Sequence, residues 1–115
     1  MQVSTPEATA FDLVRYVEAT GHLDNVATVL AELVEKIESR RLVAAAKTGV
    51  ELSVVQRTGY LLDLVGAARV TDRLAAWLAE QAPRPAPLRP DRPSDDATAD
   101  DRWQLLVNEK VEPDV

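Results

Sequence analysis

The side chains with chemistry of their own are few and lie apart along the sequence. Asp24 and Asn25 follow the single histidine, His22, where a helix is expected to begin, and short acids and amides at that place usually cap free backbone N–H groups. Ser53 and Thr58 carry hydroxyl groups, but no histidine or lysine stands at a spacing that would supply a base. Neither pattern predicts a nucleophilic active site.

Two pairs of aspartates, Asp95-Asp96 and Asp100-Asp101, are the only other candidates for a site, because paired carboxylates bind hard cations. A calcium loop also needs alternating ligands and a turn glycine, and this stretch has neither. The pattern therefore predicts a solvated acidic loop. We expect no metal, no cofactor and no enzymatic activity.

One stretch has the spacing of a helix-turn-helix, at Ala45, Gly49 and Val55. The second helix would then present Gln56, Arg57 and Thr58, residue types that contact bases. A DNA-binding protein that is anchored on phosphates needs several cations, and Arg57 is the only Lys or Arg between positions 47 and 69. A plain helical hairpin is the preferred interpretation, with a DNA-associated regulator of its own operon as the alternative.

The composition excludes several classes of protein. The 115 residues carry a net charge of −6 and include no cysteine, so a disulfide framework, a zinc cluster and thiol catalysis are excluded. An acidic chain with only two Trp, two Tyr and one Phe does not fit broad binding to phosphate backbones or a stacking platform for single strands. The longest apolar run, residues 42–46, is too short for a signal peptide or a membrane span, which predicts a soluble, cytoplasmic chain.

Start and stop signals divide residues 5–81 into about five short helices. Thr5-Pro6-Glu7 is typical of a helix start, and Gly21 is a natural end. The second helix, from about position 23, has the clearest 3.6-residue pattern of apolar side chains. That pattern comprises Leu23, Val26, Ala27, Leu30, Leu33, Val34 and Ile37.

The remaining signals predict three more helices and an extended tail. Ser39 is expected to cap a helix that ends before Gly49, the next helix covers about 51–65, and the last begins at Thr71. Prolines over 83–93 predict an extended segment, 94–101 an acidic loop, and 103–107 a strand that pairs with the stretch around Leu88 in a hairpin.

The predicted fold class is therefore mainly α, an antiparallel bundle or array of about five short amphipathic helices with a small C-terminal β element after a proline-rich segment. The expected division is a helical domain over 1–81, a connection over 82–102, and a strand and tail over 103–115 that pack on the helices. Gly59 interrupts the fourth helix at a cost of about 1 kcal/mol, which predicts that another backbone approaches it, either from the second helix or from a partner.

Four stretches in order carry a resemblance: FDLVRY at 11–16, LDNVATVLAEL at 23–33, VQRTGYLLDLVG at 55–66 and WQLLVNEKVE at 103–112. From about Thr5 to Asp114, the chain resembles the C-terminal domain of AbiEi-type antitoxins. The resemblance implies an antitoxin of a type IV toxin–antitoxin pair, a bacterial abortive-infection and phage-defence system. It implies a nucleotidyltransferase-like toxin as partner, opposed directly or functionally.

Antitoxins of this family resemble a winged helix-turn-helix joined to such a domain, and the winged part represses their operon. This sequence shows no winged-helix segment, so direct DNA binding is not expected and a truncated form is one interpretation. A homodimer and a structural remnant without activity are further alternatives. No membrane partner is expected.

Eight positions are candidates for partner contact: Arg15, Tyr16, Asp24, Asn25, Gln56, Arg57, Tyr60 and Asn108. Each also has a structural interpretation. Arg15 can pair with an acid on its own helix, and the two tyrosines can lie at the rim of the core. Gln56 and Arg57 can bridge to the tail, and Asn108 can end the strand.

Overall fold

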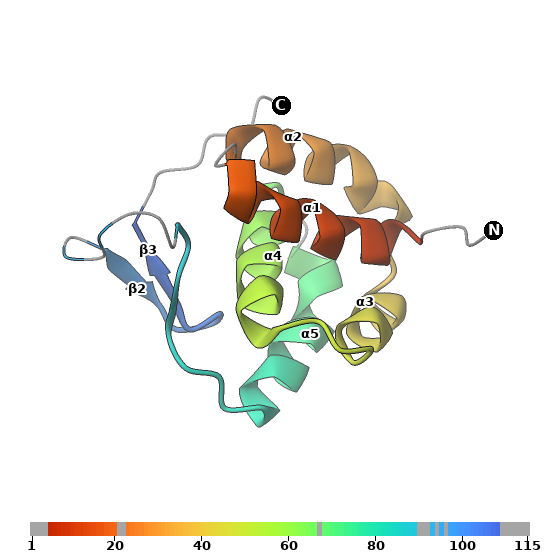
Figure 1. Cartoon of the computed structure of the whole chain (residues 1–115). Coiled ribbons are helices and arrows are strands. Elements are labelled where there is room, and N and C mark those ends of the chain that lie inside the picture. Colours follow the sequence, from red (N-terminus) through yellow and green to blue (C-terminus); the bar gives the residue numbers. More distant parts are fainter. Residues whose placement is uncertain are drawn as a thin grey trace.

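The computed structural model describes residues 5–20, 23–66, 68–89, 93, 95 and 97–108, with side chains described except at 16–20, 23–25 and 68. Its helices are α1 (Pro6–Thr20), α2 (Leu23–Leu33), the 3-10 turn η1 (Val34–Lys36), α3 (Ser39–Ala46), α4 (Leu52–Leu64) and α5 (Ala68–Glu80). The central helix is α4, which contacts α1, α2 and α5, while α3 packs on α1 and α5 (Figure 1). The mainly α prediction is confirmed.

The boundaries follow from local chemistry that was visible in the sequence. The Thr5 hydroxyl accepts a hydrogen bond from the Ala8 N–H at 3.1 Å, as a helix cap does. Gly49 and Gly66, after α3 and α4, have φ of 108° and 85°, which glycine adopts without a Cβ penalty. Of the apolar positions that the sequence pattern comprised, Val26, Ala27, Leu30 and Ile37 are buried in the core, and Leu33 and Val34 are partly buried against it. Gly21 and His22 lie outside the described residues.

The start of α3 corrects the prediction that Ser39 caps it. Ser39 is the first helical residue, and Glu38, at the cap position, makes no side-chain cap bond. Instead, the buried Glu7 of α1 accepts the Glu38 N–H on Oε2 at 2.8 Å. A carboxylate at the positive end of a helix is a stronger partner than a hydroxyl. Glu7 therefore ties α1 to α3.

The start of α5 also differs from the prediction. The helix begins at Ala68 rather than at Thr71, so Thr71 lies in its first turn and is not its cap. The Thr71 hydroxyl is buried and donates to Oδ1 of Asp63 in α4. The polar residue that was expected to start the helix instead joins it to its neighbour.

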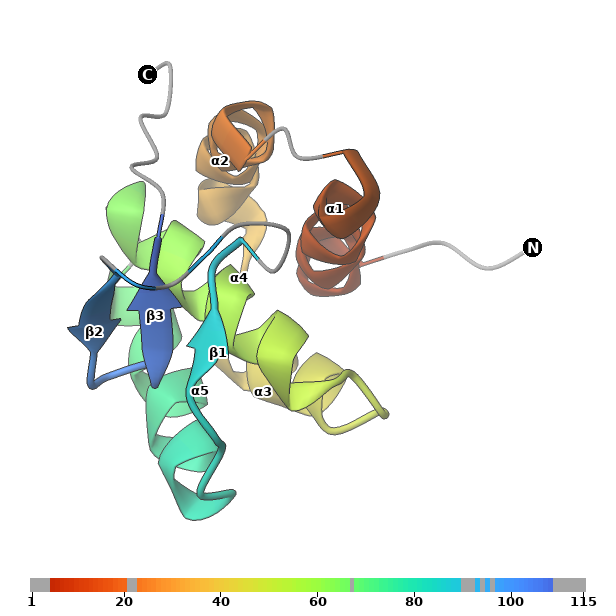
Figure 2. The ribbon, with the colours of Figure 1, turned by 60° about the vertical axis from the view of Figure 1, so that its left-hand side comes forward.

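A small three-stranded sheet completes the fold. Its strands are β1 (Ala86–Pro87), β2 (Thr98–Asp100) and β3 (Leu105–Val107), in the order β1-β3-β2. Strand β3 pairs antiparallel with β2 and parallel with β1, and it contacts α4. Figure 2 shows the three strands side by side, with β3 in the middle.

The expected pairing of 103–107 with the stretch around Leu88 is confirmed, since the Leu88 N–H donates to the Leu106 oxygen at 2.8 Å, but the expected hairpin is wrong because this pairing is parallel. The antiparallel partner of β3 is β2, which lies within the stretch expected to be an acidic loop, whereas β1 runs parallel to β3. Trp103 and Gln104 belong to the turn 101–104, because the Asp100 side chain accepts the Trp103 N–H at 3.0 Å and Gln104 has φ of 50°. The strand itself is therefore only three residues long.

Gly59 is explained by a ring rather than by a backbone. A Cβ atom at this position would lie 2.2 Å from Cζ3 of Trp103, so the indole ring occupies the space that a side chain would need. The expectation that the second helix or a partner backbone approaches Gly59 is wrong. Trp103, Leu105 and Leu88 belong to the same buried core as the helices.

Candidate functional site

The polar side chains of α4 that were predicted as candidates for partner contact lie under the C-terminal segment. Gln56 is buried, and its Nε2 donates to the backbone oxygens of Arg84 at 3.0 Å and Gln104 at 2.7 Å. Arg57 is also buried, and its Nε donates to the Pro87 oxygen at 2.9 Å. The two side chains bridge α4 to the tail, which is the structural interpretation that the sequence allowed.

The same burial decides the helix-turn-helix interpretation. Gln56, Arg57 and Thr58 would have to face solvent to reach base edges, but all three are buried. The Thr58 hydroxyl donates to the Val54 carbonyl of its own helix at 2.8 Å. The proposed recognition face of α4 is therefore covered by the chain itself, and reading of DNA by this face is excluded in this structure.

The candidate residues at the edge of the tail have internal partners too. Asn108 follows β3, and its carboxamide accepts the Arg89 N–H and donates to the Arg89 carbonyl, both at 2.8 Å. This pair of bonds continues the parallel ladder between β1 and β3 by one step. Tyr60 is half-buried, and its burial, followed by the negative charge of Asp100, raises the pKa of its phenol.

The remaining candidates lie on α1 and α2. Arg15 is exposed and its Nη1 lies 3.8 Å from Oδ1 of Asp12, an exposed ion pair on the same helix. It stands at the rim of a shallow pocket of about 260 Å³ between α1 and the α3–α4 connection. Tyr16, Asp24 and Asn25 belong to these helices, but their side chains lie outside the described part of the structure.

A cluster of polar side chains around Asp63 was not predicted. Oδ2 of Asp63 accepts Nε1 of Trp103 at 2.7 Å and Nε of Arg102 at 2.9 Å, and its Oδ1 accepts the Thr71 hydroxyl. Nη2 of Arg102 reaches Thr71 at 2.9 Å and Asp72 at 3.0 Å. Each side chain of the cluster is hydrogen-bonded to another one of it. The cluster therefore holds the tail against α4 and α5 and leaves no free nucleophile among its members. The only signal for it in the sequence was Trp103, an aromatic residue in a polar tail.

The electrostatics of the cluster favour its charged form. Partial burial lowers the pKa of the Arg102 guanidinium, but its hydrogen bond to Asp72 and its attraction to Asp63 outweigh burial and raise the pKa above its ordinary value. The guanidinium carbon also lies 5.2 Å from the centre of the Trp103 ring, within reach of a cation–π contact. Arg102 is therefore held as a cation between α4, α5 and the tail.

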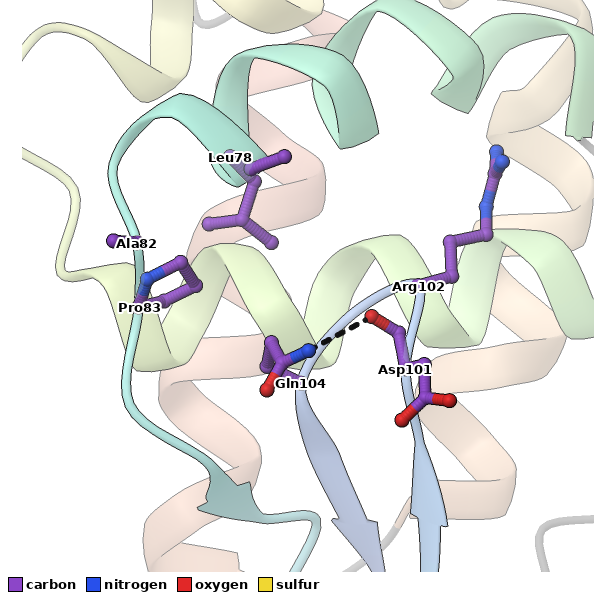
Figure 3. A pocket seen from close by; sticks show the side chains of 7 residues that line it. Leu78, Ala82, Pro83, Asp101, Arg102 and Gln104 are labelled. Carbon is purple, nitrogen blue, oxygen red and sulfur yellow. Dashed lines mark hydrogen bonds between the residues drawn. The ribbon is translucent and has the colours of Figure 1, made fainter.

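A pocket of about 320 Å³ lies where the tail meets the end of α5 (Figure 3). Leu78, Ala82 and Pro83 form one side, and Asp101 and Gln104 form the other. Gln104 donates to the Asp101 carbonyl at 3.1 Å within that second side, and the Arg102 side chain extends away from the other labelled residues. No set of charged groups converges on the space among the described residues, so we assign it no chemistry.

The described residues also hold no cluster of three or more His, Asp or Glu side chains that could bind a metal ion. Among these residues, no helix is both long and apolar enough to cross a membrane. The helical part has an exposed surface that a partner could contact. On the outward side of α2 and η1, Val29 is 37% exposed, and the exposed carboxylates of Glu32 and Glu35 have no ion-pair partner among the described residues.

Comparison with known proteins gives one match. The family model of the AbiEi antitoxin C-terminal domain matches residues 1–64. The match covers α1–α4 and ends where α4 ends, so it is shorter than the resemblance seen in the sequence, and the tail lies outside it. Searches of curated proteins and of solved structures give no match.

Proposed function

Because the chain belongs to the AbiEi antitoxin C-terminal domain family, we propose that it is the antitoxin of a type IV toxin–antitoxin pair and opposes a nucleotidyltransferase-like toxin. The observation that carries the proposal is the match over residues 1–64, which coincides with the four helices α1–α4. The family is one of antitoxins and not of enzymes.

The proposed mode of action is binding without catalysis. An enzyme that handles nucleotides presents positive charge around its substrate site, and an acidic surface complements it. The surface of this chain that fits such a partner is the acidic face of α2, defined by Val29, Glu32 and Glu35. Two exposed carboxylates without an ion-pair partner among the described residues follow an exposed apolar side chain there, which supplies both charge and an apolar contact.

The proposal places the chain in the cytoplasm, beside the nucleotides and RNA that such a toxin uses. It assigns no toxin contact to Gln56 or Arg57, because both side chains are committed to the tail. It keeps Arg15 as a peripheral candidate, since that side chain is exposed on α1.

Growth rescue in bacteria that express a nucleotidyltransferase toxin tests the proposal. Co-expression of the whole chain should restore growth. The double substitution Glu32→Lys/Glu35→Lys should abolish rescue, because it turns the acidic face positive. The matched control is Asp95→Lys/Asp101→Lys, which changes net charge equally at two exposed positions elsewhere.

Two outcomes would contradict the proposal at different levels. A soluble, folded chain that gives no rescue would show that it does not oppose the toxin by itself. Rescue that survives Glu32→Lys/Glu35→Lys would keep the antitoxin role but remove the acidic face of α2 from it. Circular dichroism of each variant confirms that the helices are intact.

A further inference from the structure

A groove between the outward sides of α3 and α5 has a character opposite to that of the rest of the molecule. Its volume is about 380 Å³. Three cations line it: Arg40 of α3, Lys47 directly after α3, and Arg73 of α5. Its apolar floor includes the half-buried ring of Trp77. We call this the α3–α5 groove and define it by its lining: Arg40, Val43, Lys47, Arg73, Ala76, Trp77 and Glu80.

The helical repeat places these side chains together. Residues 40 and 43 lie three positions apart on α3, and Lys47 follows directly after its last turn. Residues 73, 76 or 77, and 80 recur every three or four positions on α5, so that each helix turns one side toward the groove. The two helices pack against each other, and the groove is therefore built on them and on the first residue of the α3–α4 connection.

The three cations of the groove have no ion-pair or hydrogen-bond partner among the described residues: Arg40, Lys47 and Arg73. The neighbouring Arg41, in contrast, pairs with Glu38 at 3.1 Å. In a chain of net charge −6, three unpaired cations facing one carboxylate, that of Glu80, form a local positive site beside an exposed aromatic surface.

We propose that the α3–α5 groove docks a short acidic segment of a partner protein. An apolar side chain of that segment covers Trp77, and Asp or Glu residues on either side of it reach Lys47, Arg40 and Arg73. The span from residue 40 to residue 47 is about 10 Å along a helix, which matches roughly two turns of a docked helix. Trp and Arg at the centre of a contact are the residue types that carry most binding energy.

Charge and shape favour a protein segment over the other occupants. A nucleic acid brings phosphates at every step and would be repelled by a chain of net charge −6, with Glu80 inside the groove. A second copy of this chain would have to place its own acidic face in the groove, and such a head-to-tail contact builds rings or open filaments instead of a simple pair. A short acidic segment also meets Glu80 and the net negative charge, but its few carboxylates lie only beside the three cations of the groove, whereas a nucleic acid extends phosphates beyond the groove over the rest of the acidic surface.

Binding of a synthetic peptide to the full chain tests the inference independently of any toxin. The probe is a helical peptide of about fourteen residues with a central leucine and glutamates three and four positions to either side. The control peptide has glutamine in place of each glutamate. Calorimetry measures affinity, and tryptophan emission reports the groove because Trp77 is accessible whereas Trp103 is fully buried.

The acidic peptide should bind at micromolar concentration and the glutamine peptide at least ten-fold more weakly. Lys47→Glu/Arg73→Glu should reduce affinity for the acidic peptide at least ten-fold, whereas Arg15→Glu/Arg84→Glu, an equal change of charge outside the groove, should leave it within two-fold. Trp77→Ala should weaken binding and Trp77→Phe should retain most of it. With the unmodified chain, affinity should fall about ten-fold between roughly 50 mM and 500 mM salt.

Three results would overturn the inference. The first is equal affinity for the two peptides. The second is unchanged peptide binding by folded Lys47→Glu/Arg73→Glu. The third is tighter binding to a DNA duplex than to the peptide, with loss on the same substitution, which would make the groove a phosphate site. None of these results bears on growth rescue, so the antitoxin proposal stands or falls separately.

Discussion

The indole ring of Trp103 lies flat against Gly59, with three ring carbons 2.2–2.4 Å from the place where a Cβ atom would be. One turn further along α4, Asp63 accepts the indole N–H at 2.7 Å. The helix α4 therefore provides both the space for the indole ring, at Gly59, and a hydrogen-bond acceptor for its N–H, at Asp63. This contact holds the tail over α4, which buries Gln56 and Arg57.

Gly59→Ala should lower the free energy of unfolding by about 2 kcal/mol, because the new methyl group would overlap a rigid buried ring. The sign is the reverse of that expected for alanine in an ordinary helix, where the substitution stabilises by about 1 kcal/mol. Urea denaturation measures the difference. In a Trp103→Leu background most of the cost should vanish, and an equal cost there would mean that the ring is not its cause.

Asp63→Ala should lower the free energy of unfolding by about 3 kcal/mol, since it leaves the buried donors of Trp103 and Thr71 and the Arg102 guanidinium without their acceptor. Asp72→Ala is the matched control, because Asp72 also bonds Arg102 but has a side chain 69% exposed, against 23% for Asp63. Its cost should stay below about 1 kcal/mol. Equal costs for both would show that burial does not set the strength of this cluster.

The helical part was predictable because its signals are local. The Thr5 cap, the glycine ends at Gly49 and Gly66, and the apolar repeat of α2 depend on residues within a few positions of one another, and the structure confirms them. The errors involve contacts between elements. Glu7 accepts the Glu38 N–H at the start of α3 from 31 residues away, and β3 pairs antiparallel with β2, while the stretch around Leu88 pairs with β3 in the parallel direction.

The candidate site shows the same limit. Gln56 and Arg57 were expected either to contact a partner or to bridge to the tail, and the structure shows the bridge; its acceptors are the backbone carbonyls at 84, 87 and 104, which no sequence pattern marks. Asp63 was overlooked because a single aspartate in an amphipathic helix carries no signal until Trp103 and Arg102 lie beside it. The α3–α5 groove was missed because its cations come from two helices and share no spacing.

Glu7→Ala should lower the free energy of unfolding by about 2 kcal/mol, because the Glu38 N–H at the start of α3 would lose its partner and a cavity would remain. Glu7→Gln keeps an acceptor oxygen and the volume, and should recover about half of the loss. Chemical denaturation followed by circular dichroism measures both. Glu35→Ala on the exposed side of η1 is the control and should change stability by less than about 0.5 kcal/mol.

The raised pKa of Tyr60 predicts that the free energy of unfolding falls at alkaline pH. Burial and then the charge of Asp100 raise its pKa in the folded chain above the unfolded value of about 10. The neutral phenol is therefore favoured by folding, and its contribution is complete below the unfolded pKa and lost as pH rises through the folded one. Between about pH 8 and pH 11, Tyr60→Phe should lose less stability than the parent chain, and Asp100→Asn should move the phenol titration to lower pH by ultraviolet absorbance. Identical pH dependence of the parent and Tyr60→Phe would contradict this.

Substitution of Ala82 by glycine should increase the free energy of unfolding. It follows the last turn of α5 with φ of 47°, a left-handed conformation in which a Cβ atom costs about 1 kcal/mol, and its side chain is exposed and contributes little packing. Ala82→Gly relieves that cost and keeps the N–H bond to the Ala79 carbonyl at 3.2 Å. Because glycine has a larger entropy in the unfolded chain, part of this relief is offset, and the net gain in the free energy of unfolding should be about 0.5 kcal/mol.

The control is Ala79→Gly, three residues earlier and also exposed. Position 79 is within the helix α5, so this substitution should lower the free energy of unfolding by about 1 kcal/mol. The same substitution should thus have opposite signs at the two positions in parallel urea titrations. Destabilisation at both would show that position 82 is not strained.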